Sequence, residues 1–163
     1  MTENTNPLGQ YYRQPQIYIK LPSGGRYYPK EVYTPTETGE IPILPMTAKD
    51  EMAFKTPDAM INGQSTVDVI KSCVPNLLDP WKMVNYDTDA VLLAIRIATY
   101  GETMDITFRV PGTEEDQQHS MNLPALLEDI GRIEIADSTT TSKGFKIDIQ
   151  PLDYKTLTKI QIA

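Results

Sequence analysis

The residue best suited to acid–base chemistry is His119, the single histidine of this 163-residue chain. It lies in the stretch PGTEEDQQHSMN together with the consecutive carboxylates Glu114, Glu115 and Asp116. A histidine can activate a serine nucleophile, and carboxylate oxygens can bind a divalent cation. Consecutive carboxylates converge on one ion only in a shaped loop, and this stretch has no calcium-loop spacing. We expect a solvated loop; a small hydrolase or ligand-binding domain using His119 and the acidic loop is the alternative.

Two further motifs could carry chemistry. Cys73 is the only cysteine, which excludes an intramolecular disulfide and a cysteine-rich zinc site. It shares an apolar helix face with Val67 and Ile70, so we expect burial rather than reactivity. The glycine-rich PSGGR lacks the spacing and the Lys-Ser/Thr ending of a phosphate-binding loop. We therefore expect no catalytic residue, no metal and no cofactor, and no enzymatic activity.

Charge narrows the classes of partner. The net charge is −7 and the isoelectric point about 4.7, whereas nucleic acids and anionic membranes attract basic patches. The N-terminus has no basic region followed by an apolar run, and the longest apolar run, Ala90 to Ile95, is too short to span a bilayer. We expect a cytosolic protein that binds neither nucleic acid nor membrane.

The apolar pattern predicts a flexible N-terminal arm followed by one α+β domain. The arm covers residues 1–14 and the domain residues 15–163. We divide the domain into a β-hairpin region (15–46), a helical cluster (47–101) and a β-rich section (102–163).

The hairpin is predicted from QIYIKLPSGGRYYP. Isoleucines alternate with Tyr18 and Lys20, and a Ser-Gly-Gly turn leads to Tyr27 and Tyr28. GEIPILPM predicts another short strand, which must lie at an edge because Pro42 cannot donate to a ladder.

Helix starts are marked by capping residues. Thr47, with Asp50 three residues later, predicts a capped helix that ends near Lys55. Pro57 predicts a second, short helix, and Ser65 the N-cap of a third over STVDVIKSCV. In the β-rich section, MDITFRV predicts a strand, PGTEEDQQHSMN a polar loop and LPALLEDIG a helix. RIEIA and KGFKIDIQP then predict strands separated by the turn DSTTTS.

The stretch DTDAVLLAIRIATYGE predicts a helix that is apolar almost all round. We expect Asp87 to cap it and Gly101 to end it. Such a helix must be buried on all sides. An unpaired buried guanidinium is very costly, so we expect Arg96 to form a core ion pair with Asp89, two turns earlier on the same face. Asp87, Glu102 and Asp105 are the other carboxylates near in sequence, and a role of Arg96 at a partner interface is the alternative.

The sequence also contains a weak internal repeat. Residues 41–55 align without gaps with residues 147–161, and both predict a strand, a proline and a helix start. The identical pairs are Ile41/Ile147, Ile43/Ile149, Pro45/Pro151 and Lys49/Lys155.

Surface association is suggested by tyrosine. Six of the nine tyrosines fall in the first 33 residues, and tyrosine is enriched at protein interfaces because its ring buries area while its hydroxyl stays paired. The candidate partner-binding residues come from the hairpin and the first helix: Tyr18, Tyr27, Tyr28, Met46, Lys49, Met52 and Phe54.

Three stretches carry a family resemblance: LPSGGRYYP, LPMTAKDEMAFKTPDAMINGQSTVDVIKSCVPNLLDPWKM and DAVLLAIRIATYGETMDI. Over residues 17–109 the chain resembles the baseplate hub assembly family of T-even-type contractile-tailed phages. The resemblance implies a non-enzymatic protein that builds the tail hub through contacts with hub or tape-measure proteins. It also implies a location in the host cytoplasm during assembly.

Alternatives stay open within that resemblance. A chaperone of the tape-measure protein is one reading, and a permanent structural subunit of the baseplate hub in the virion is the other. A homo-oligomer is also open. Some relatives carry cysteine pairs that suggest a zinc knuckle after the ATYG helix, but RVPGTEEDQQHSMN has none, so the resemblance brings no metal.

Overall fold

The computed structural model describes residues 12–29, 31–55, 63–110, 112, 116–134 and 136–162. The fold is α+β, as the sequence predicts. In chain order the elements are β1 (Ile17–Lys20), β2 (Glu40–Ile43), α1 (Ala48–Phe54), α3 (Gln64–Cys73), the 3₁₀ helix η2 (Pro80–Lys82), α4 (Asn85–Tyr100), β3 (Thr103–Arg109), β4 (Asp116–Asn122), α5 (Leu123–Gly131), β5 (Ser138–Thr140), β6 (Lys146–Asp148) and α6 (Tyr154–Ile162).

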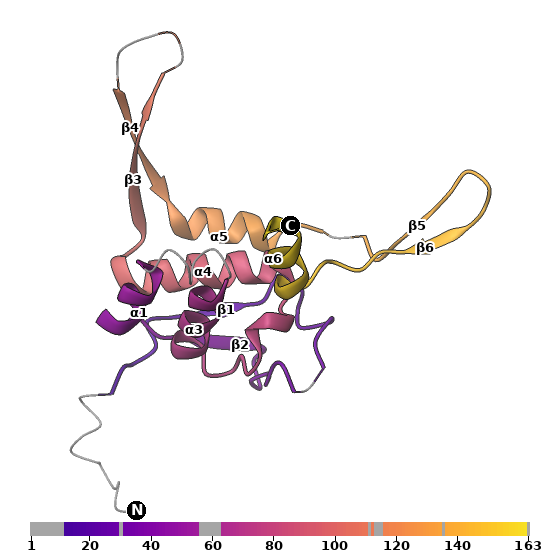
Figure 1. The fold of residues 1–163 in the computed structure, drawn as a ribbon, viewed down its shortest axis with the longest axis horizontal. Helices are drawn as coiled ribbons and strands as arrows, with labels where there is room; N and C mark the ends of the chain where they lie inside the picture. Colours follow the sequence, from indigo (N-terminus) through magenta and orange to yellow (C-terminus); the bar gives the residue numbers. More distant parts are fainter. Residues whose placement is uncertain are drawn as a thin grey trace, which may run out of the picture.

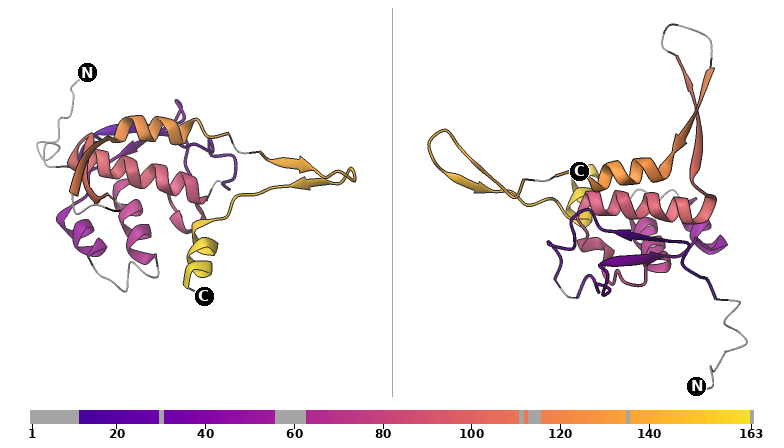
Figure 2. Two further views of the ribbon diagram at one scale, coloured as in Figure 1. Left: turned by 90° about the horizontal axis from the view of Figure 1, so that it is seen from above. Right: turned by 180° about the vertical axis from the view of Figure 1, so that it is seen from behind.

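Helix α4 is the centre of the body. It packs against α5 on one side and against β1, β2 and α3 on the other (Figures 1 and 2). Its residues Ala90, Val91 and Ala94 are fully buried. The prediction that α4 is buried is therefore correct for the face that carries these three residues. It is wrong for the rest of the helix, because Asp89 and Tyr100 are exposed.

The N-terminal strand β1 pairs antiparallel with β2, with Ile17 opposite Ile43 and Ile19 opposite Ile41. The predicted alternation is confirmed, but the predicted partner around Tyr27 and Tyr28 is wrong, because those residues form no strand. Pairing with β2 instead buries both isoleucines of β2 completely in the core, and apolar burial is the larger gain.

The first two described helices differ in how they begin. Thr47 caps α1 in the predicted capping box with Asp50, and Lys55 is the C-cap. Ser65 is not a cap: α3 begins one residue earlier, after Gly63 at φ 75°. The short helix predicted from Pro57 lies outside the described residues.

The β-rich section contains two antiparallel ribbons that project from the body (Figure 1). The β3–β4 ribbon includes the stretch predicted as a polar loop, and the β5–β6 ribbon includes the predicted DSTTTS turn. Neither stretch shows apolar alternation, because both faces of these strands are largely solvated. The described residues of RIEIA form no strand, whereas α5 is confirmed, with Asn122 as its cap.

Candidate functional site

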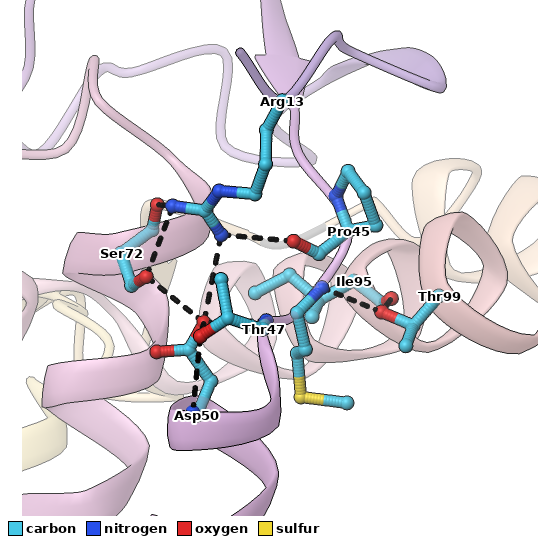
Figure 3. A network of polar contacts seen from close by, with 8 residues as sticks. Arg13, Pro45, Thr47, Asp50, Ser72, Ile95 and Thr99 are labelled. Carbon is cyan, nitrogen blue, oxygen red and sulfur yellow. Dashed lines mark hydrogen bonds and ion pairs between the residues drawn. The ribbon is translucent and has the colours of Figure 1, made fainter. Parts of the chain in front are cut away.

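Arg13 binds the N-terminal segment to helices α1 and α3 (Figure 3). Its guanidinium donates from Nη1 to the Pro45 carbonyl at 2.9 Å and from Nη2 to the Ser72 carbonyl at 2.7 Å. The same group lies 3.5 Å from Oδ2 of Asp50. The cation therefore lies beside the last carbonyls of α3, where the helix dipole favours it, and beside the Asp50 carboxylate in the first turn of α1. Arg13 belonged to the predicted flexible arm, whose residues 1–11 lie outside the described residues.

Asp50 is the acceptor at the centre of this cluster. Its Oδ2 accepts hydrogen bonds from the Thr47 backbone N–H at 2.8 Å, the Thr47 hydroxyl at 2.8 Å and the Ser72 hydroxyl at 3.0 Å. Burial by itself raises the pKa of the Asp50 carboxyl, but these hydrogen bonds and the Arg13 charge outweigh it and lower that pKa below its usual value. The cluster joins the N-terminal segment, α1 and α3.

A second cluster holds the 21–28 turn on the first turn of α4. Asp87 is fully buried and accepts from the Ser23 backbone N–H at 2.8 Å, the Ser23 hydroxyl and the Tyr28 hydroxyl at 2.7 Å. The Tyr28 oxygen in turn accepts from the Val84 N–H at 3.0 Å. Burial raises the pKa of Asp87, and the hydrogen bonds from Ser23 and Tyr28 oppose that rise.

Asp87 is therefore not the predicted N-cap. Helix α4 begins at Asn85, with Val84 as a cap that offers no side-chain hydrogen bond, and the backbone N–H of Val84 is satisfied by Tyr28. A carboxylate in the first helical turn still benefits from the helix dipole. Its three donors come from the distant turn, which no local capping pattern could reveal.

Next to this turn, a polar contact reaches the base of the β5–β6 ribbon. The Tyr27 hydroxyl donates to Asp137, and Arg26 Nη1 lies 3.3 Å from the same carboxylate. The Arg26 guanidinium also lies 5.6 Å from the centre of the Tyr27 ring. Because Arg26 and Asp137 are both mostly exposed, we assign this contact a small effect on stability.

The candidate partner-binding residues do not form one surface. Tyr18 on β1 and Met52 on α1 are more than half exposed, and Lys49 is exposed. The others are engaged internally: Tyr27 and Tyr28 in the contacts above, and Met46 and Phe54 against the core. Their role in partner binding stays a prediction.

The predicted core ion pair is wrong. Among the described residues no ion pair joins Arg96 to Asp89; the Arg96 guanidinium instead lies 4.4 Å from the ring centre of Tyr100, one turn later. One of its nitrogens, Nη1, is buried without a hydrogen-bond partner. A side chain turned towards Tyr100 cannot also reach Asp89 two turns earlier, and the cation–π contact replaces the carboxylate.

The residues considered for catalysis lie apart. His119 is exposed on β4 opposite Ile106, and Cys73 is buried, which raises the pKa of its thiol to about 11. Glu114 and Glu115 lie outside the described residues. Within the described ranges, no cluster of three His, Cys, Asp or Glu side chains could hold a metal ion. No helix there is long and apolar enough to cross a membrane.

Sequence comparison gives one finding that covers almost the whole chain. A family model described as T4 bacteriophage base plate protein matches residues 14–161. The match includes the C-terminal third, to which the resemblance inferred from motifs did not extend. The comparisons with curated proteins and with solved structures gave no match. The chain therefore belongs to the T4 bacteriophage base plate protein family, and this membership implies contacts with other phage structural proteins.

Proposed function

We propose that this baseplate protein is a hub assembly factor that acts through protein–protein contacts, without catalysis, and chaperones the tape-measure protein. Its family membership and its two ribbons support this proposal. Each ribbon carries exposed apolar side chains at a distance from the core: Phe108 on β3, Phe145 directly before β6, and Ile147 on β6. Exposed apolar side chains that gather on projecting elements are typical of interaction sites.

The experiment is an affinity pull-down of the tagged full chain from phage-infected cells, read by mass spectrometry. Recovery of tape-measure or hub proteins above the level of an untagged control is expected. Finished virions are analysed in parallel. A chaperone is recovered with the tape-measure protein and is absent from virions, whereas a permanent structural subunit of the hub is present in both. Recovery of no tail protein contradicts the proposal.

Ribbon variants sharpen this test. Phe108→Lys and Phe145→Lys each place a charge on one ribbon, and Tyr12→Lys, a change at an exposed residue of the N-terminal segment, is the matched control. We expect at least one ribbon variant to lose tail proteins from the pull-down while the control retains them. Equal recovery with all three variants would place the contact elsewhere.

The alternative from another class is a hydrolase or ligand-binding domain that uses His119. His119→Ala separates the two: the assembly proposal expects unchanged phage yield, because this side chain is exposed on β4 and forms no hydrogen bond with the described residues. Loss of a measurable activity in this variant would favour the enzyme.

A further inference from the structure

The internal repeat of the sequence is also a repeat of structure. Strand β2, Pro45 and α1 correspond to strand β6, Pro151 and α6, and the helices begin at aligned residues, Ala48 and Tyr154. The aligned residues before them both cap: the Thr47 hydroxyl accepts from the Asp50 N–H, and Asp153 Oδ1 accepts from the Thr156 N–H at 2.7 Å. The chain therefore builds the same strand–proline–capped-helix unit twice.

The two units differ in what covers their strand. In the first, Ile41 and Ile43 are 0% exposed and lie opposite Ile19 and Ile17 of β1. In the second, Ile147 is 49% and Ile149 is 43% exposed. Strand β6 pairs with β5 alone among the described strands, and a lone two-stranded ribbon is at best marginally stable in water. The strand opposite β6 is β5, where polar, exposed Thr139 faces Ile147, so among the described residues no apolar strand covers the second unit as β1 covers the first.

Strand β1 has one unpaired edge. Pro42 has no N–H, so the Tyr18–Pro42 pair cannot be a doubly hydrogen-bonded pair of the β1–β2 ladder. Such pairs alternate along an antiparallel ladder, so the backbone N–H and C=O of Tyr18 point away from β2. No other described strand pairs with β1, and an open edge of this kind is a template for strand addition.

An apolar groove runs beside this open edge. It lies between β1, α4 and α5, has a volume of about 400 Å³ and is lined by Ile17, Ile19, Ile97, Leu127 and Gly131, among others. Glu102 and Glu128 also line it. Lys20 lines the groove as well. The β5–β6 ribbon carries Lys143 in its turn, opposite in charge to the two glutamates, whereas Lys146 on β6 lies 3.5 Å from Asp148 of the same strand.

We propose that β6 of one copy of this chain adds to the open β1 edge of a second copy, with Ile147 and Ile149 filling the groove. In each copy, β1 then lies between its own β2 and the neighbour's β6, two strands with the same Ile-x-Ile spacing followed by Pro45 or Pro151. The contact is head-to-tail, so it continues until a ring closes or a filament forms. This self-association does not depend on the proposed chaperone role.

The first measurement is sedimentation velocity of the purified full chain at increasing concentration. We expect a mass that rises above the 18.3 kDa of one chain. Ile147→Lys/Ile149→Lys places two charges on the ribbon, and both residues are already about half exposed, so the fold tolerates them. Gly131→Arg fills the groove, and a Cβ at Gly131 meets nothing within 4 Å. We expect each variant to be monomeric.

The decisive experiment mixes the two variants in equal amounts. The ribbon variant keeps an intact groove and the groove variant keeps an intact ribbon, so the mixture must form a one-to-one dimer and nothing larger. Thr107→Lys, at an exposed residue of β3 on the other ribbon, is the control and should associate as the wild type does. Circular dichroism of each variant confirms its folding.

Three results would overturn the proposal. One is a wild-type chain that stays monomeric at every concentration. This is also the result expected if β6 pairs with β1 of its own chain instead of a second copy. The second is a Gly131→Arg variant that associates as the wild type does. The third is a mixture of the two variants that stays monomeric.

Discussion

Replacing Tyr28 with phenylalanine removes one oxygen atom and tests the tie between the 21–28 turn and α4. That oxygen donates to the Asp87 carboxylate at 2.7 Å and accepts from the Val84 N–H at 3.0 Å. Both Asp87 and Val84 are buried, so water does not replace the lost partner freely. The variant therefore weakens a charge-assisted hydrogen bond and leaves a backbone donor unsatisfied.

The magnitude follows from these two losses. A hydrogen bond to a charged group contributes about 1.5–3 kcal/mol, and a buried unsatisfied donor costs about 1–3 kcal/mol. Because both losses fall on one cluster and are not additive, we expect a destabilisation of about 3 kcal/mol. For a chain of this size that corresponds to a fall in Tm of roughly 6–12 °C.

The assay is equilibrium unfolding in urea, followed by circular dichroism. We expect the midpoint to fall while the slope m stays constant, since the surface exposed on unfolding is unchanged. Tyr18→Phe is the matched control, because this exposed tyrosine on β1 makes no hydroxyl hydrogen bond with the described residues, and its expected change is within about 0.5 kcal/mol. A Tyr28→Phe variant as stable as this control would refute the reasoning.

Three further predictions concern the other anchored positions. Asp50→Asn should remove part of the acid sensitivity of folding. Because the pKa of Asp50 is lowered in the folded state, the stability that its carboxylate contributes is present above the unfolded pKa of about 3.9 and is lost as pH falls through the folded pKa. Urea unfolding from pH 7 to pH 3 measures this, and a variant with the wild-type pH profile would contradict it. Thr47→Ala should cost about 1 kcal/mol through loss of the α1 cap, and Thr47→Ser should restore it. Gly63→Ala should cost more than about 1 kcal/mol, because φ is 75° and the new Cβ would lie 3.2 Å from Thr158. The measurement is the Tm together with the fluorescence of Trp81, which stacks on Tyr154 of α6 and therefore reports a shift of that helix. A Gly63→Ala variant with the wild-type Tm and the wild-type spectrum would refute the close approach of Gly63 to α6.

Secondary structure was predictable where its cause lies within a few residues of the chain. The capping box of α1 needs only Thr47 and Asp50, and the end of α4 needs only Gly101, whose φ is 95°. Strand β3 and helix α5 follow from apolar spacing over a single segment. In each case the deciding hydrogen bond or apolar face is local, so the sequence pattern is sufficient.

Tertiary structure decided the partners. Strand β1 pairs with β2 and not with the predicted hairpin strand at Tyr27 and Tyr28, because pairing with β2 completes the core. Asp87 has the residue type of a cap, but it lies in the first turn of α4 after the N-cap Val84, and Ser23 and Tyr28 of a distant turn make it a buried acceptor. Strand β4 forms because β3 lies beside it and offers backbone partners, not because its own polar sequence favours a strand.

The candidate contact surfaces likewise depend partly on local sequence and partly on neighbours that are distant in the chain. The sequence by itself determined the repeat of Ile41/Ile43 in Ile147/Ile149 and the family to which the chain belongs. It could not determine that one pair of isoleucines is buried and the other exposed, since identical local patterns pack according to what lies opposite them. Only the tertiary structure decided that β1 covers β2 and that β6 stands on a projecting ribbon, because burial depends on neighbours far away in the sequence.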